Sequence, residues 1–331
     1  MATTSLSSAT RRTSSSSRPT SSIKVRGVLG PADQDLKAIT FLNRVVHWTE
    51  SGISIEADPR HVELILQDLC LEEAKGSSTT GTKIKEDDTT EVLDKQMTTR
   101  YRSLVARLNY MSSDRPDIQY TVKELCREMS SPTTTSFFRF KRLGRYLRQK
   151  PRLMIDFDYQ EADREVDTLK ISCDTDWAGC RRTRRSTNGG CALRGTHLIK
   201  SWSTTQAIVA LSSGEAEFYG LTRAVCTALG LKSLCADFRL VVELQVYTDS
   251  TAAKGITQRR GLGKLRHMDV QYVWLQEKSG NKEYHLNKVL GTLNPSDIMT
   301  KYLDEMTMVG HLVRLHVRHA EGRSAVAPLI T

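Results

Sequence analysis

The sequence lacks the features that would place the protein in a membrane or outside the cell. No run of about 18 or more apolar residues occurs, so no membrane-spanning helix is indicated. The seven cysteines contain no Cys-x-x-Cys pair and are odd in number, which argues against a disulfide framework and a zinc ribbon. We therefore expect a protein of a reducing compartment, the cytoplasm or the nucleus, with no membrane partner.

Acidic residues are missing from the first 32 positions. This stretch is rich in Ser and Thr and also carries five basic residues, which are Arg11, Arg12, Arg18, Lys24 and Arg26. Such a composition is typical of an organelle transit peptide, but it is also typical of a chain too poor in large apolar residues to pack. We expect residues 1–34 to be a disordered tail, with organelle targeting as the alternative.

Positive charge is what the chain has in excess. Its 331 residues include 48 Lys and Arg against 38 Asp and Glu, a formal charge of +10. A basic surface attracts nucleic acid without sequence recognition, although a solvated surface that happens to be basic is the alternative. The hydrophobic fraction of 39% is sufficient for cores in about two domains.

The first half of the chain has mainly helical patterns. Apolar residues at three- and four-residue spacing predict helices over 35–47, 59–71, 101–111, 118–129 and 137–147. A polar stretch over residues 73–99 is predicted to be a linker. Six Lys and Arg side chains lie between positions 139 and 150, and this basic face either follows a phosphate backbone or is simply solvated.

The second half changes to strand patterns interrupted by helices. Strands are predicted over 169–176, 189–194, 198–203, 240–248 and 283–289. Helices are predicted from Ser212 or Ser213 to about 238, over 250–258 and 266–278, and from 294 onward. This order indicates a mixed sheet covered by helices, and it resembles the layout of a ribonuclease H domain.

Four carboxylates stand where strand pattern meets turn or helix pattern in that half: Asp174, Glu217, Asp249 and Asp297. Carboxylates gathered in one pocket repel one another and raise their pKa values unless cations neutralise them. Magnesium prefers oxygen ligands, which suits Asp and Glu better than Cys or His. The quartet therefore predicts a magnesium site.

Seven ordered motifs carry a family resemblance. They are Tyr101-Arg-Ser-Leu-Val105, Arg115-Pro-Asp-Ile118, Ser172-Cys-Asp-Thr-Asp-Trp-Ala-Gly179, Arg185-Ser-Thr187, Val209-Ala-Leu-Ser-Ser213 with Glu215-Ala-Glu217, Arg266-His-Met-Asp-Val270, and Asn294-Pro-Ser-Asp-Ile298 with Thr300-Lys301. From about residue 41 to 312 the chain resembles the C-terminal part of a copia-type retrotransposon Pol polyprotein.

The resemblance implies an α/β fold in which a ribonuclease H-like mixed five-stranded sheet, flanked by helices, occupies residues 167–315. A mostly helical remnant of the reverse transcriptase thumb and connection would occupy residues 35–160, with a C-terminal tail over 316–331. The Tyr-x-Asp-Asp tetrapeptide of the polymerase palm is absent from the sequence. No polymerase activity is therefore expected, and a reverse transcriptase from another element copy would be the partner.

Carried over by position, the catalytic and metal-binding quartet of the family is Asp174, Glu217, Asp249 and Asp297. Asp176 would share a side of the strand with Asp174, because side chains alternate along a strand. Glu215 would lie about 200° from Glu217 around a helix, so only one of the two can face the site. The family pattern favours Asp174 and Glu217.

The resulting hypothesis is an endonuclease that hydrolyses the RNA strand of RNA/DNA hybrids with two Mg²⁺ ions, for which Mn²⁺ could substitute. A catalytically inactive nucleic-acid-binding relic is the alternative. Hybrids are recognised largely through 2′-hydroxyls and phosphates, so no sequence motif for the contact is required. Candidate contacts are Arg185, Ser186, Ser213, Arg142 and Arg145, although turn formation and helix capping explain the serines equally well.

Overall fold

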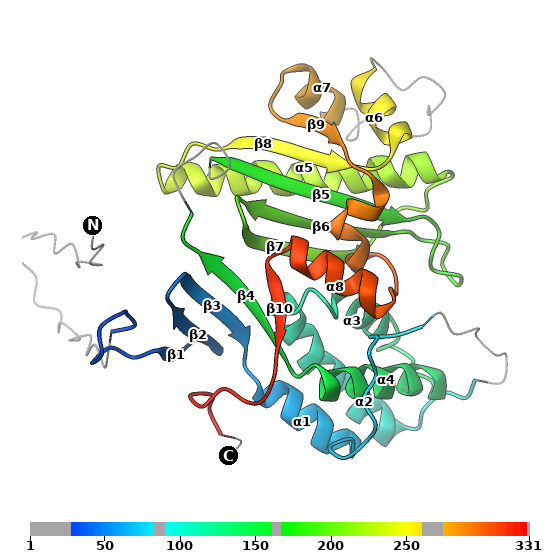
Figure 1. The fold of residues 1–331 in the computed structure, drawn as a ribbon. Coiled ribbons are helices and arrows are strands. Elements are labelled where there is room, and N and C mark those ends of the chain that lie inside the picture. Colours follow the sequence, from blue (N-terminus) through cyan, green and yellow to red (C-terminus); the bar gives the residue numbers. More distant parts are fainter. Residues whose placement is uncertain (1–27, 83–89, 161–166, 260–273, 330–331) are drawn as a thin grey trace, which may run out of the picture.

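The computed structural model describes residues 28–82, 90–160, 167–259 and 274–329. Within these ranges the chain is a mixed α/β protein that contains two five-stranded sheets. Figure 1 shows one sheet above the other, each with its own helices. No helix in the described ranges combines the length and the apolar character needed to cross a bilayer.

The first sheet, formed by the second half of the chain, has the strand order β7-β6-β5-β8-β9. Its antiparallel part consists of β5 (Thr168–Asp176), β6 (Thr187–Arg194) and β7 (His197–Thr205). Strand β8 (Glu243–Thr248) pairs in parallel with β5, and β9 (His285–Lys288) pairs in parallel with β8. The five strands predicted from alternation in this half are thus confirmed to within a few residues.

Helices cover both faces of this sheet. Helix α5 (Ser213–Asp237) packs against the sheet face that carries the side chains of Thr175 and Asn188. Gly220 of α5 comes so close to this face that an added Cβ would lie 2.3 Å from the Thr175 hydroxyl oxygen. The 3₁₀ helix η4 (Pro295–Met299) packs against the face of Gly189, the residue after Asn188 in β6. A Cβ added to Gly189 would lie 2.5 Å from Cγ2 of Thr300, which directly follows η4. Successive strand residues point to opposite faces, so α5 and η4 lie on opposite sides.

The remaining helices of this half lie at its edges. Helix α6 (Thr251–Gln258) follows β8, and helix α7 (Trp274–Gly280) precedes β9. Residues 266–273 of the helix predicted over 266–278 lie outside the described ranges. The helix predicted from position 294 is interrupted: η4 ends at Met299, and α8 (Glu305–Arg314) begins only after Asp304, whose side chain accepts a hydrogen bond from the Thr307 amide.

The second sheet has the order β1-β2-β3-β4-β10 and is antiparallel throughout. Its strands are β1 (Ala38–Phe41), β2 (Arg44–Thr49), β3 (Gly52–Ala57), β4 (Arg152–Asp158) and β10 (Val317–Ala320). Its helices are α1 (Arg60–Leu69), α2 (Lys95–Met111), α3 (Gln119–Arg127) and α4 (Thr134–Gln149).

The helix predicted over residues 35–47 is wrong, because this segment forms the β1–β2 hairpin. Leu42 and Asn43 between the strands both have positive φ, at 48° and 57°. Two such residues in succession are the mark of a tight hairpin turn that matches the twist of the flanking strands. The spacing of Leu42, Val45 and Val46 fits a helix, but the β-branched Val45 and Val46 lie in strand β2, which such residues favour.

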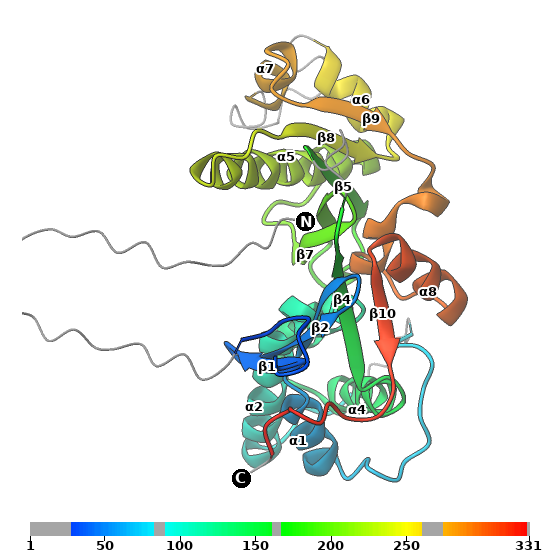
Figure 2. The ribbon, with the colours of Figure 1, turned by 60° about the vertical axis from the view of Figure 1, so that its left-hand side comes forward.

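The tail predicted over residues 316–331 is also wrong in part. Residues Val317–Ala320 form β10, which pairs with β4 from Arg152 to Ile155. Figures 1 and 2 show β10 leaving α8 and running along β4. A four-residue strand whose partner lies more than 150 positions away leaves no local signal.

The two halves share one hydrophobic core. Buried residues of the first half, such as Leu125 and Phe140, belong to the same cluster as Leu193, Ile298 and Leu312 of the second half. Polar contacts join the halves as well: Gln119 donates to the Ser201 hydroxyl at 2.9 Å. The helices of the first half are therefore held in a fixed position beside the sheet of the second half.

Candidate metal centre

Three of the four predicted carboxylates converge. Asp174 lies near the end of β5, Asp249 directly follows β8, and Glu217 lies in the first turns of α5. Because β5 and β8 are parallel neighbours, their carboxyl ends meet at one edge of the sheet. One oxygen from each of the three side chains lies within 4.8 Å of the others. This spacing is compatible with a shared divalent cation and oxygen ligands at about 2.0–2.6 Å.

The fourth carboxylate, Asp297, lies beside Asp174 but outside that group of three. It belongs to η4, and Lys301 forms an ion pair with it at 2.9 Å. The 3₁₀ helix is tied to the strand by Asn294, whose side-chain amide donates to the Cys173 carbonyl at 2.9 Å. The Thr300 hydroxyl donates to the Asp174 carboxylate and fixes its orientation.

Three acids of the site, Glu217, Asp249 and Asp297, have raised pKa values. Burial, followed by the charges of Asp174 and Asp249, raises the pKa of Glu217 to about 9. Burial and the charge of Asp174 raise the pKa of Asp297 to about 7, and the same two causes raise the pKa of Asp249. Crowded, desolvated carboxylates of this kind are stabilised by a proton or by a cation.

Unsatisfied oxygens at the site fit cation ligands. Within the described ranges, buried Glu217 Oε2 and Asp297 Oδ1 have no hydrogen-bond partner. Buried polar atoms without partners are uncommon, and an ion that completes their coordination is one explanation. The donor set is made of carboxylate oxygens, which hard divalent cations such as Mg²⁺ prefer.

The structure separates the roles of Glu215 and Glu217. Glu215 is buried, and it accepts hydrogen bonds from the Leu211 amide at 3.0 Å and from the Tyr219 hydroxyl at 2.5 Å. These contacts join the start of α5 to the preceding loop, so Glu215 stabilises the fold while Glu217 joins the carboxylate group. Asp176 ends β5 and lines a neighbouring cavity instead of joining that group.

The residues predicted to contact nucleic acid are not gathered in one place. Ser186 is fully buried, and its hydroxyl accepts a hydrogen bond from the Ala178 amide, so a direct contact with nucleic acid is contradicted. Arg185 and Ser213 are exposed. In the sequence, Arg185 follows Asp174 and Ser213 precedes Glu217. Arg142 and Arg145 line a separate hollow on α4, where Arg142 donates to Thr79 at 2.8 Å.

Two groups at the site were missed in the sequence. Lys301 and Thr300 contact the carboxylates directly, and the motif Thr300-Lys301 was the available signal. The arginines of the loop between β5 and β6 were visible as the run Arg181-Arg182-Thr183-Arg184-Arg185. Arg127 on α3 and Arg139 on α4 line the same cavity as this loop, but they are distant from it in sequence and left no signal.

The fold and the site together define a mixed α/β protein with an acidic candidate metal centre at the carboxyl ends of two parallel strands. No protein-family model matches the chain. Curated relatives include the uncharacterized mitochondrial protein AtMg00810 of Arabidopsis thaliana, 38% identical over 37% of this chain and 49% of that protein. Retrovirus-related Pol polyproteins also match: transposon TNT 1-94 of Nicotiana tabacum is 28% identical over 65% of this chain, and transposon RE1 of Arabidopsis thaliana is 29% identical over 54% of it.

Retrovirus-related Pol polyproteins of copia-type transposons are thus homologues of this chain. It spans about half the length of the mitochondrial protein but only 16% and 12% of the TNT 1-94 and RE1 polyproteins, which fits a C-terminal segment of such a polyprotein. Among solved structures, the foamy viral protease-reverse transcriptase in complex with dsDNA has a TM-score of 0.42 at 12% identity and covers 78% of this chain and 45% of the viral chain. A likeness of that size does not establish a common fold.

Proposed function

We propose that this protein is a metal-dependent endonuclease that hydrolyses the RNA strand of RNA/DNA hybrids. The observation that carries the proposal is the convergence of Asp174, Glu217 and Asp249 from three separate segments, with Asp297 beside them. We assign the β7-β6-β5-β8-β9 sheet to the ribonuclease H-like fold, because its strand order and its helices agree with the layout that the sequence motifs imply. The Pol relatives support a retroelement enzyme in general.

The four carboxylates would hold two Mg²⁺ ions, or Mn²⁺ in their place. When bound, such a pair of ions supplies an activated water, neutralises phosphoryl charge and assists the leaving 3′ oxygen. The chain itself supplies orientation: Thr300 positions the Asp174 carboxylate, and Asn294 fixes η4 against β5. Lys301 neutralises Asp297 and so limits the repulsion among the acids.

The proposal is tested by incubating the purified full chain with a hybrid labelled on each strand in turn. We expect the RNA strand to be cut in Mg²⁺ and the DNA strand to remain intact, because only the RNA carries 2′-hydroxyls along the minor groove. Chelation with EDTA is expected to stop cutting. Cutting of both strands, or cutting that persists in EDTA, would contradict the assignment.

A catalytically inactive nucleic-acid-binding relic is the second candidate. The observation that favours it is the formal charge of +10, because a basic surface attracts nucleic acid whether or not the carboxylates catalyse cleavage. In that case the protein would bind the hybrid in a salt-dependent way but would not cut it in Mg²⁺ or Mn²⁺. The assay above separates the two candidates.

The elevated pKa values predict how stability depends on pH in the metal-free protein. The pKa of Glu217 is raised above its unfolded value, so its protonated form stabilises the fold at low pH, and this contribution is lost as pH rises from about 4.5 toward 9. We expect the melting temperature in EDTA to fall over this range by several degrees, since about 1 kcal/mol corresponds to roughly 2–4 °C in a protein of moderate size.

Differential scanning fluorimetry at pH 5, 7 and 9 measures this dependence. Mg²⁺ should raise the melting temperature more at pH 9 than at pH 5, because the ion binds the ionised carboxylates. The Glu217→Gln variant cannot ionise there, so its metal-free melting temperature should vary less with pH. Equal pH dependence in the variant and the wild type would show that Glu217 is not the titrating group.

A further inference from the structure

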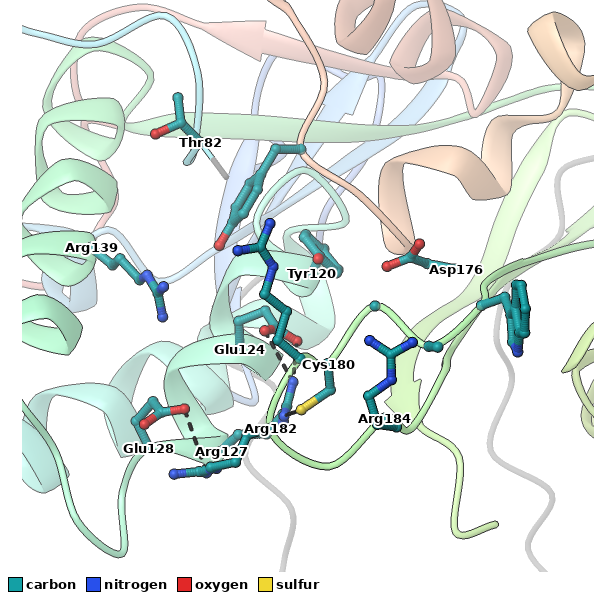
Figure 3. A pocket seen from close by; sticks show the side chains of 15 residues that line it. Thr82, Tyr120, Glu124, Arg127, Glu128, Arg139, Asp176, Cys180, Arg182 and Arg184 are labelled. Carbon is teal, nitrogen blue, oxygen red and sulfur yellow. Dashed lines mark hydrogen bonds and ion pairs between the residues drawn. The ribbon is translucent and has the colours of Figure 1, made fainter. Parts of the chain in front are cut away.

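A cavity lined by arginines lies where α3 and α4 face the loop between β5 and β6, residues 177–186 (Figure 3). Its volume is about 320 Å³, and Tyr120 and Tyr302 contribute their rings to its wall. Five guanidinium groups line it, from Arg127, Arg139, Arg181, Arg182 and Arg184. Both halves of the chain are needed to build this cavity.

The cavity keeps an excess of positive charge after its own carboxylates are counted. Three carboxylates share the lining with the five arginines, which leaves a formal excess of two positive charges. Glu124 is already paired with Lys123 at 2.5 Å and with Arg127 at 3.0 Å, and Glu128 is paired with Arg182 at 3.7 Å. The dashed lines in Figure 3 mark pairs of this kind. A basic concavity of this composition attracts anions.

Two of the arginines are exposed and available. In the described ranges, the guanidinium groups of Arg181 and Arg184 form no ion pair or hydrogen bond with the protein. Guanidinium groups match phosphate oxygens in geometry and donate two parallel hydrogen bonds to them. These two side chains are therefore the ones that a bound anion would engage first.

The loop that presents these arginines is held in a defined shape. Ala178 and Arg184 have positive φ, at 52° and 56°, a conformation that few non-glycine residues adopt. The Arg184 amide donates to the Cys180 carbonyl at 2.7 Å, and the Ser186 hydroxyl accepts from the Ala178 amide at 3.1 Å. A loop already ordered in this way loses little conformational entropy on binding. Unusual backbone conformations maintained by their surroundings are frequent at binding sites.

The cavity adjoins the carboxylate centre. Asp176 lines the cavity and stands two residues after Asp174, a distance of about 7 Å along the strand. Each strand of a duplex carries a phosphate about every 3.4 Å of the helix axis. A nucleic acid whose scissile phosphate lies at the carboxylates therefore has further phosphates within reach of the cavity.

We propose that this cavity binds a backbone phosphodiester of the nucleic-acid substrate near the cleaved bond. The choice of substrate rests on the proposed nuclease function, but binding in the cavity does not require cleavage. The arginines come from α3, α4 and the β5–β6 loop, so the first half of the chain would take part in holding the substrate. The helices of the first half would thus have a role at the nuclease centre.

The test compares two charge-matched double variants of the full chain. Arg181→Ala with Arg184→Ala removes two cavity charges, whereas Lys232→Ala with Arg239→Ala removes two exposed charges near the other end of α5. The 25 residues of α5 extend over about 37 Å, so the control charges are remote from the cavity. All four side chains are exposed, and unchanged melting temperatures will show that both variants fold.

Binding of a fluorescent RNA/DNA hybrid is measured by anisotropy in EDTA, where metal-dependent cutting is absent, at several salt concentrations. We expect the cavity variant to bind at least about tenfold more weakly and to have a salt slope smaller by about 1–2, since each phosphate contact contributes about 0.9. The control variant should bind within about twofold of the wild type. Equal affinity and equal slope in the two variants would overturn the proposal.

Cleavage by the wild type in Mg²⁺, measured in parallel, separates this inference from the proposed function. If the wild type binds but does not cut, and the cavity variant loses affinity, the nuclease assignment fails and the phosphate site stands. If the wild type cuts the hybrid and the cavity variant binds like the control, the phosphate site fails and the nuclease assignment stands.

Discussion

The Asp174→Asn variant is expected to cut the RNA strand of a hybrid at least about 10³-fold more slowly than the wild type, a loss of about 4 kcal/mol of transition-state stabilisation. Asp174 is the central member of the carboxylate group, because its charge acts on Glu217, Asp249 and Asp297 alike. The amide of Asn has nearly the same shape but no charge. The substitution therefore removes cation binding without opening a cavity.

Glu215→Gln is the matched control for this loss. Glu215 lies close in sequence to Glu217, yet one of its oxygens accepts from the Leu211 amide and the other from the Tyr219 hydroxyl. Glutamine keeps an acceptor oxygen for the Leu211 amide, and its NH2 group can donate to the Tyr219 hydroxyl oxygen instead. We expect the control to keep its cleavage rate within about tenfold, while Asp174→Asn also loses the Mg²⁺-induced rise in melting temperature. Similar rates for the wild type and Asp174→Asn would refute the carboxylate site.

The Arg115→Met variant is expected to lose about 3–5 kcal/mol of folding free energy, the usual cost of breaking a buried ion pair. Arg115 is fully buried and binds the Asp117 carboxylate through two hydrogen bonds, at 2.7 and 2.9 Å. It also donates to the Lys150 and Pro151 carbonyls, which lie between α4 and β4. Methionine fills part of the volume but leaves the Asp117 charge buried without its partner.

The Asp117 carboxylate connects several elements. Burial acts to raise its pKa, but the charge of Arg115, the nearby His319 ring at 3.7 Å and the hydrogen bonds from Arg115 outweigh it and hold the pKa well below the ordinary value. The Tyr146 hydroxyl of α4 also donates to it, at 2.8 Å. The network thus joins α4 to β10, and its loss should weaken both halves together. Because the folded pKa is depressed, this stabilisation exists above the unfolded pKa and disappears as pH falls.

Urea denaturation followed by tryptophan fluorescence and circular dichroism measures the effect. Arg318→Met is the control, because Arg318 is largely exposed in its pair with Asp156 and such pairs contribute at most about 1 kcal/mol. We expect one cooperative transition in all three proteins, displaced strongly only in Arg115→Met. Two separate transitions in the wild type would contradict the shared core of the two halves.

Local patterns identified most of the second half of the chain. The alternation over residues 169–176 and the serine-capped helix after Ser212 are properties of neighbouring residues, so they appear in the sequence and again in β5 and α5. The four acids were selected by their position at strand and helix junctions and by the family motifs. Three of them converge because the strand order brings the ends of β5 and β8 together.

Contacts between distant residues decided the rest. The spacing of Leu42, Val45 and Val46 is compatible with a helix as well as with the observed hairpin. Only the pairing of β2 with β3 selects the strand. The sequence by itself determined the order of elements in the second half, the choice of the four acidic candidates and the family resemblance. Tertiary structure alone decided that β10 completes the sheet of the first half and that arginines from three segments enclose one cavity. It also decided that Glu215 has a structural role and that Ser186 is buried. Each of these features depends on packing between segments, which no local sequence pattern records.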